Sequence, residues 1–215
     1  MSPALRVLRG LACLLALPLL TGCLMFERAP ADLSCDPDLA GRWVPLPNNT
    51  AQNPLGRDDY AQVDAKCRVT LVDDKNMQDR PGFTALGFRL DGKRYLALDQ
   101  AAMRELFNDT KPPTKPSTLP ATSVVLVKYR IVGDVLELAL ADMTYVVDQA
   151  KTGKLKVREA DTMVYLAEGD RAAMRSLLAD HPDLFESDDA VQEGAPGNSS
   201  GRYFRLRRAS VGATP

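Results

Sequence analysis

Apolar and polar residues alternate through several short segments of the chain, a pattern typical of strands with one buried face. Three pairs of these segments are expected to form hairpins, namely 83–90 with 93–98, 124–132 with 135–140, and 154–158 with 162–167. Asp91-Gly92 and Gly133-Asp134 separate the strands of the first two pairs, and such dipeptides favour two-residue turns. Further strands are expected at 41–44, 67–72 and 202–208.

An amphipathic helix is expected after each hairpin, begun by an aspartate that caps its first backbone N–H groups. The capping residues are Asp99, Asp142 and Asp170, and Gly153 and Pro182 are expected to end the second and third helices. Ordinary alternation explains this recurrence more simply than an internal duplication, which stays open. The prediction is an α+β fold, mainly antiparallel β, with about nine strands in a single barrel- or sandwich-like sheet and three short helices.

The amino terminus has the three parts of a secretory signal peptide. Arg6 and Arg9 are followed by an apolar run over 11–20, and no acidic residue occurs before Glu27. Positive charge ahead of a short apolar run favours export of the part that follows. An uncleaved membrane helix is the alternative, but the most apolar part is only about ten residues long, whereas a bilayer span needs about twenty.

The apolar run ends in Leu20-Thr21-Gly22-Cys23, which resembles the lipobox of bacterial lipoproteins. The resemblance implies that a type II signal peptidase recognises Leu20, Thr21 and Gly22 and cleaves before Cys23. It also implies diacylglycerol on the Cys23 sulfur and an acyl chain such as palmitate on the new amino group. Each buried methylene contributes about 0.8 kcal/mol, so several chains anchor stably. Leu24, in place of aspartate, favours the outer membrane facing the periplasm.

These features divide the chain into four parts. We expect a signal peptide over 1–22, a lipidated tether over 23–34, an antiparallel β-rich domain over 35–208 and a flexible tail over 209–215.

Two of the four cysteines remain after Cys13 leaves with the signal peptide and Cys23 takes the lipid. In an oxidising compartment, Cys35 and Cys67 are expected to form a disulfide. Closing a loop of about 33 residues contributes about 3–4 kcal/mol in the chain-entropy model. Metal ligation by this pair is disfavoured, because two cysteines and one distant histidine do not have the spacing of a zinc site.

Composition excludes some functions and disfavours others. Without residues 1–22 the chain has 25 basic and 28 acidic residues, a net charge of 25 − 28 = −3, which excludes nucleic acid as an expected partner. His181 is the single histidine, and no Gly-x-Ser-x-Gly motif accompanies it. The sequence therefore predicts neither an enzyme nor a cofactor or metal site.

The last expected strand places Tyr203, Arg205 and Arg207 on one face. Such a face suits lipid phosphates or the carboxylates of a partner. We favour the simpler interpretation, in which the charges protect an edge strand from pairing with another chain.

Residues 38–43 resemble the Gly-x-Trp opening strand of lipocalin-like barrels, with Gly41 and Trp43 in the matching positions. There the tryptophan plugs one end of a barrel that binds a ligand. The chain lacks a later Thr-Asp-Tyr motif and has interposed helices, and a single tryptophan packs in many first strands. We therefore expect a non-catalytic envelope lipoprotein, with membrane contact through its acyl chains and a domain that binds a protein partner or is structural. The alternative is a lipocalin-like carrier of a small apolar ligand.

Overall fold

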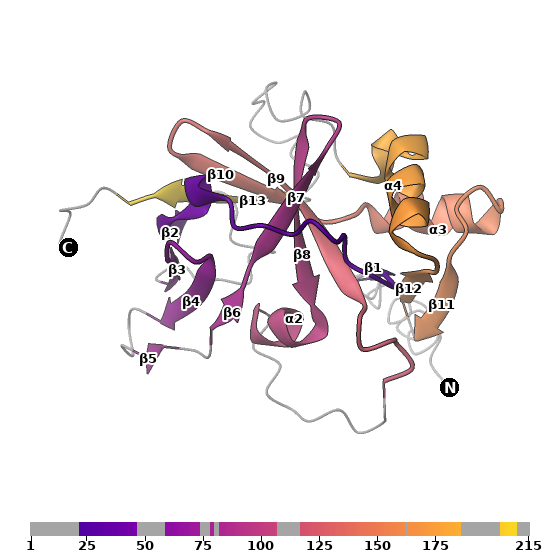
Figure 1. Ribbon diagram of the computed structural model, residues 1–215, viewed down its shortest axis with the longest axis horizontal. Coiled ribbons are helices and arrows are strands. Elements are labelled where there is room, and N and C mark those ends of the chain that lie inside the picture. Colours follow the sequence, from indigo (N-terminus) through magenta and orange to yellow (C-terminus); the bar gives the residue numbers. More distant parts are fainter. Residues whose placement is uncertain are drawn as a thin grey trace, which may run out of the picture.

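The structure is a computed structural model, and it describes residues 22–46, 59–73, 78–79, 82–106, 117–161, 163–185 and 203–209. The fold is mixed α+β and consists mostly of strands (Figure 1). The described residues contain thirteen strands and three α-helices, whereas about nine strands were expected, because several strands are only two to four residues long. Most of the predicted signal peptide and tail lies outside the described residues.

The strands are β1 Cys23–Phe26, β2 Gly41–Pro45, β3 Asp59–Val63, β4 Arg68–Asp73, β5 Gln78–Asp79, β6 Phe83–Thr84, β7 Leu86–Leu90, β8 Lys93–Asp99, β9 Val124–Val132, β10 Val135–Ala139, β11 Arg158–Asp161, β12 Val164–Ala167 and β13 Tyr203–Arg208. The α-helices are α2 Gln100–Leu106, α3 Met143–Lys151 and α4 Arg171–Asp180. Two short 3-10 helices, η1 Pro37–Leu39 and η3 Pro182–Leu184, complete the described elements.

The first two predicted hairpins and the three predicted caps are confirmed. The third hairpin is present, but its first strand covers 158–161 instead of the predicted 154–158. β7 pairs with β8 across Asp91-Gly92, where both residues have positive φ, and β9 pairs with β10 in the same antiparallel way. β11 and β12 form the third pair. The carboxylates of Asp99, Asp142 and Asp170 each accept backbone N–H groups from the first turn of the following helix.

Strands that follow one another in the chain pair within three runs, β2 to β5, β7 to β10 and β11 to β12. The order β11-β12-β1-β9-β10-β13-β2-β3-β4-β5 is open, with β11 and β5 at its edges. Three further pairs lie off this order, between β4 and β6, β7 and β8, and β8 and β9. Only Ala85 separates β6 from β7, so this short stretch of chain pairs with β4 at its start and with β8 at its end.

The amino-terminal strand differs from the predicted tether over 23–34. β1 pairs in parallel with β12 and antiparallel with the start of β9. Leu24, Met25 and Phe26 are all buried. β10 pairs only with the second half of β9, so the first half has room for another strand on that side. β1 takes this position because burying its three large apolar side chains is favourable.

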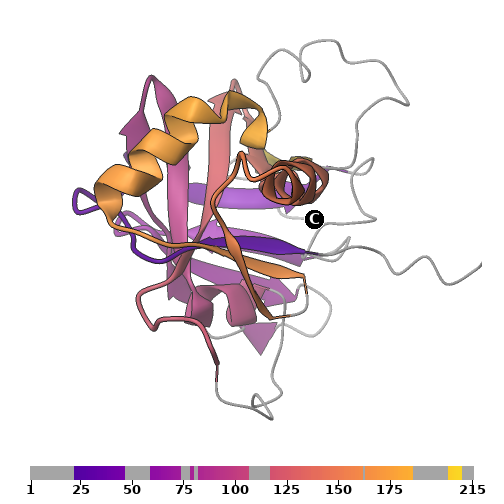
Figure 2. The ribbon, with the colours of Figure 1, turned by 90° about the vertical axis from the view of Figure 1, so that its right-hand side faces the viewer.

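Two hydrophobic clusters occupy opposite faces of the central strands. Val125 and Val127 of β9 belong to the cluster that contains Trp43, whereas Leu126 belongs to the cluster beneath α3 and α4. Figure 2 shows these two helices together on one side of the molecule, away from α2. Because both faces of β9 are covered, residues 124–129 are buried without interruption. None of the helices in the described part of the chain is long and apolar enough to cross a membrane.

Candidate ligand cavity

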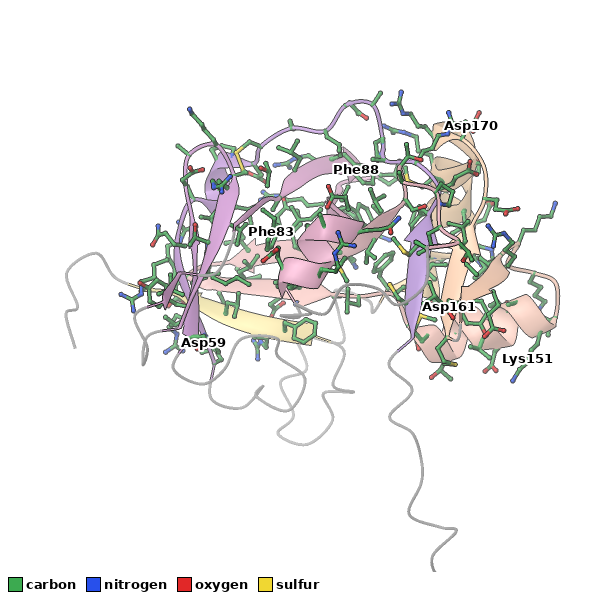
Figure 3. All side chains as sticks on the ribbon, turned by 90° about the horizontal axis from the view of Figure 1, so that it is seen from below. Asp59, Phe83, Phe88, Lys151, Asp161 and Asp170 are labelled. Carbon is green, nitrogen blue, oxygen red and sulfur yellow. A yellow bond between two sulfur atoms is a disulfide. The ribbon has the colours of Figure 1, made fainter. Side chains whose placement is uncertain are left out.

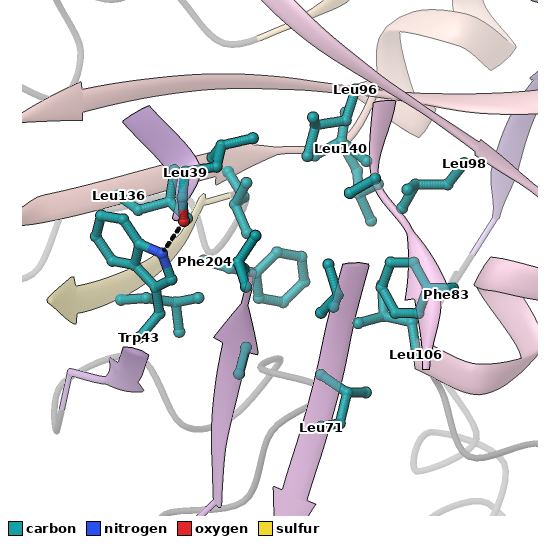
Figure 4. A pocket seen from close by; sticks show the side chains of 17 residues that line it. Leu39, Trp43, Leu71, Phe83, Leu96, Leu98, Leu106, Leu136, Leu140 and Phe204 are labelled. Carbon is teal, nitrogen blue, oxygen red and sulfur yellow. Dashed lines mark hydrogen bonds between the residues drawn. The ribbon is translucent and has the colours of Figure 1, made fainter. Parts of the chain in front are cut away.

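A cavity of about 100 Å³ lies within the cluster that contains Trp43, and all of the side chains that line it are apolar (Figure 4). The lining side chains come from β2, β3, β4, β6, β8, β9, β10 and β13, with contributions from η1 and α2. They occupy alternate positions, as in Leu96 and Leu98 of β8 or Leu136 and Leu138 of β10. Alternation is expected because successive side chains point to opposite faces of a strand.

One end of the cavity, here called the closed end, is sealed by Trp43 and its contacts. Trp43 is fully buried, and its indole N–H donates to the carbonyl oxygen of Leu39 at 2.7 Å. The guanidinium of Arg208 lies 4.4 Å from the centre of the indole ring. The same guanidinium donates to the carbonyl oxygens of Ala40 and Asp38. Arg208 thus joins the last strand to the turn that precedes β2.

The turn at the closed end is fixed to the sheet by a disulfide. Cys35 and Cys67 are bonded, as predicted, and are 32 positions apart in the sequence. The bond connects Cys35, two residues before η1, to Cys67, the residue just before β4. Ser34 also forms an isolated bridge with Gly87 of β7, so this segment is held from two sides.

An ion-pair network next to the disulfide centres on Asp36. Its carboxylate accepts the hydroxyl of Tyr129 at 2.6 Å and lies 3.3 Å from a guanidinium nitrogen of Arg94. Burial raises the pKa of Asp36, but hydrogen bonds from Tyr129 and from the Asp38 backbone, together with Arg94 and Arg89, outweigh it and hold the pKa below its usual value. Burial, and then the bond to Asp36, raise the pKa of the Tyr129 hydroxyl.

The opposite end of the cavity is more exposed, and we call it the rim. Its residues are the lining side chains that are only partly buried, namely Phe83, Leu106, Leu138, Leu140 and Phe204. Figure 4 shows Phe83 and Leu106 on the side of the cavity away from Trp43. Phe204 lies near the start of β13, whereas Arg208 of the closed end finishes that strand.

The last strand is not an edge strand, so the predicted role of its charges is wrong. β13 pairs with β10 on one side and with β2 on the other. Arg205 and Arg130 both contact the carboxylate of Glu137, which is only 2% exposed. Arg207 lies 3.5 Å from the carboxylate of Asp134. The charges therefore pair within the sheet, and the side chain of Tyr203 lies outside the described part.

Only the end of the predicted lipobox is described, since Leu20 and Thr21 lie outside the described residues. A side chain at Gly22 would meet the backbone oxygen of Met163 at 3.0 Å and the end of Met143 at 2.9 Å. The backbone N–H of Cys23 donates to the same oxygen of Met163. Burial raises the pKa of the Cys23 thiol to about 11.

The single histidine contacts a tyrosine. The Nδ1 atom of His181 lies 2.9 Å from the hydroxyl of Tyr145, at the carboxyl-terminal end of α4. Burial and the charge of Asp183 raise the pKa of that hydroxyl. Within the described ranges, no cluster of three or more histidine, cysteine, aspartate or glutamate side chains is arranged to hold a metal ion.

Sequence reasoning identified Trp43 and the disulfide but missed the cavity, Arg208 and the Asp36 network. The alternation of apolar and polar residues along 67–72 and 135–140 indicates which side chains point inward on each strand. Those inward-pointing side chains include residues that line the cavity. Arg208 and Trp43 are 165 positions apart in the sequence (208 − 43), so no local sequence pattern predicts their contact.

No protein-family model, no curated protein and no solved structure matches this chain. Its function is therefore inferred from the cavity, the closed end and the amino-terminal strand.

Proposed function

We propose that the domain is a lipocalin-like barrel that binds a small apolar ligand in its interior. The observation that carries the proposal is a cavity of about 100 Å³ with an exclusively apolar lining, between the buried Trp43 at the closed end and the partly exposed side chains of the rim. β2, β3, β4 and β6 pair in succession, and so do β7, β8, β9, β10 and β13, while Ala85 alone joins β6 to β7 along the chain. The β13–β2 pair returns to the first of these strands, and β5, β1, β12 and β11 lie outside this ring of pairs. Such an order supports closure into a barrel.

The lining indicates what kind of ligand fits. A polar group inside would find no hydrogen-bond partner among the lining side chains, and an unpaired buried polar group is costly. An apolar cavity of about 150 Å³ in another protein holds benzene. The interior therefore suits a single ring or part of a hydrocarbon chain, with any polar group outside the rim.

Two features at the closed end support the lipocalin-like interpretation. Trp43 of the Gly-x-Trp segment seals the interior, as the resemblance implies, and Arg208 of the last strand covers it. The protein-binding or structural module, favoured from the sequence alone, becomes the second candidate. The cavity is a positive feature that a structural module does not require, whereas a carrier depends on one.

The experiment uses Trp43 as the reporter, because it is the only tryptophan and lines the cavity. We expect 8-bromooctanoate to quench its fluorescence saturably in the mature chain with Cys23→Ser. Val127→Phe adds bulk inside the cavity and should weaken binding at least tenfold, about 1.4 kcal/mol. Val132→Phe is the matched control, on the same strand but 58% exposed, and should bind normally. Linear quenching that Val127→Phe leaves unchanged would contradict the proposal.

We further propose that the protein is a non-catalytic envelope lipoprotein, attached through Cys23 to the outer membrane and facing the periplasm. The motivation is the lipobox directly after a charged start and an apolar run. Cys23→Ala should leave an unprocessed precursor that takes up no radioactive palmitate. Cys13→Ala, a change within the same signal peptide, should be processed and labelled normally. Normal processing of Cys23→Ala would overturn the anchor.

A further inference from the structure

The amino-terminal strand brings Cys23 to the level of the cavity. β1 and β9 are antiparallel, with Met25 opposite Val125 and Phe26 opposite Val124. Continued by two positions, this register places Cys23 opposite Val127, a residue of the cavity lining.

The end of β10 also lies next to this part of β9, close to Val127. Ala139 pairs with Lys128, so the next residue, Leu140, also arrives opposite Val127. Leu140 belongs to the rim. Cys23 at the start of β1 therefore lies close to the end of β10. This position is at the rim of the cavity, away from Trp43.

The side chain of Cys23 is on the face of the sheet that carries the cavity. Cys23 packs against the same hydrophobic cluster as the rim residues Leu138, Leu140 and Leu106. The alternate residue, Leu24, belongs to the cluster beneath α3 and α4. Hydrocarbon attached to the Cys23 sulfur thus begins beside the rim, not on the helix-covered face.

We propose that the lipid anchor holds the rim of the cavity against the bilayer, and that the ligand is an acyl chain of a membrane lipid. The inference rests on the proposed lipid anchor and on the proposed binding function. β1 begins at Cys23, so no flexible segment separates the acylated residue from the sheet. Hydrocarbon leaving this residue fixes the rim near the membrane surface and leaves the closed end in water.

This orientation lowers the barrier to ligand entry. A chain that crosses water exposes each methylene at a cost of about 0.8 kcal/mol. At a rim in contact with the bilayer, the chain passes from one apolar environment to another while its headgroup stays at the interface. The apolar rim side chains Phe83, Leu106 and Phe204 suit that contact.

The test compares two label positions on the lipidated protein in phosphatidylethanolamine–phosphatidylglycerol vesicles. Ala101 is exposed, so Ala101→Cys places a fluorophore on the outside of α2, the helix that supplies Leu106 to the rim. The rim residue Phe83, labelled in Figure 3, belongs to β6, which packs against this helix. Val132→Cys places it at the end of β9, next to the Gly133-Asp134 turn and away from the rim. Cys23 is then a thioether and Cys35 is in the disulfide, so only the introduced thiol reacts.

Nitroxide-labelled lipids should quench the label at position 101 at least threefold more than the label at 132. Thr118→Cys gives a second label should Ala101→Cys fold poorly, because Thr118 is exposed and follows Ser117, whose hydroxyl donates to the side chain of Gln100 at the start of α2. A label there should behave like the label at position 101. Equal quenching, or stronger quenching at 132, overturns the orientation even when 8-bromooctanoate still quenches Trp43. Failure of the unmodified protein to float with vesicles overturns the anchor, and this inference with it.

Discussion

At the scale of single residues, the structure of the closed end depends on a few polar contacts made by the side chains of Arg208 and Asp36. Arg208 lies over the indole of Trp43 and donates to two carbonyl oxygens of the preceding turn. Asp36 accepts from Tyr129 and Arg94. Each contact joins segments that are distant in sequence, so these side chains determine where the turn before β2 sits on the sheet.

Arg208→Met should lower the free energy of unfolding by about 1–3 kcal/mol, because it removes a cation–π contact and leaves two carbonyl oxygens without their donor. Arg207→Met, at the preceding residue, is the matched control. Its guanidinium is 57% exposed and its ion pair is at the surface, so the expected change is below about 1 kcal/mol. Urea unfolding followed by Trp43 fluorescence measures both, and equal losses would contradict the role of Arg208.

Asp36→Asn should change how stability depends on pH. The carboxylate has a lowered pKa in the fold, so its ionised form stabilises the protein above its unfolded pKa of about 4. This contribution disappears as the pH falls through the folded pKa. We expect Asp36→Asn to be less stable at pH 7 and to lose less stability below pH 4 than the unchanged protein does. Asp38→Asn serves as the control, because its carboxylate also pairs with Arg94 but its side chain is 58% exposed, and it should change the pH dependence much less. Parallel pH curves for Asp36→Asn and the unchanged chain would be inconsistent with the network.

At the scale of elements, short sequence patterns suffice to predict the hairpins and the helix caps. Pairing between strands that are distant in the sequence is not predictable from such patterns. Asp91-Gly92 and Asp142 act within a few residues, so the sequence sufficed to place them. Whether a strand lies at an edge depends on the whole sheet, so the pattern of 202–208 alone does not indicate that β13 has a partner on each side. The tether predicted over 23–34 differs from the strand β1 in the structure, although Leu24, Met25 and Phe26 are as apolar as a buried strand requires.

The disulfide belongs to this scale because it connects the turn before β2 to β4. Cys35→Ser should lower the melting temperature by roughly 10 °C under oxidising conditions. The reason is that the variant loses the about 3–4 kcal/mol that closing this loop contributes to the free energy of unfolding. The difference from the unchanged protein should disappear when both are measured with a reductant. Identical melting temperatures without reductant would mean that the bond contributes nothing to stability.

At the scale of the whole molecule, two hydrophobic clusters share β8 and β9 but differ in packing. The cluster beneath α3 and α4 includes Leu126 and Leu178, whereas the other surrounds a cavity next to Val127 and Leu136. Alternation along each strand predicted a buried face, but the volume left between those faces depends on how eight segments pack together. The sequence therefore indicated the lining residues without indicating that space remains among them.

The most direct measurement is an isotope-filtered NOE experiment on protein with ¹³C-labelled leucine and valine methyl groups and unlabelled octanoate. Binding in the cavity predicts contacts from the octanoate chain to Val127 and Leu136, which line it. It predicts none to Leu126, the neighbour of Val127 on the opposite face of β9, or to Leu178 of α4. Contacts to Leu126 and Leu178, or no contacts at saturating octanoate, would contradict the proposal that this cavity binds hydrocarbon.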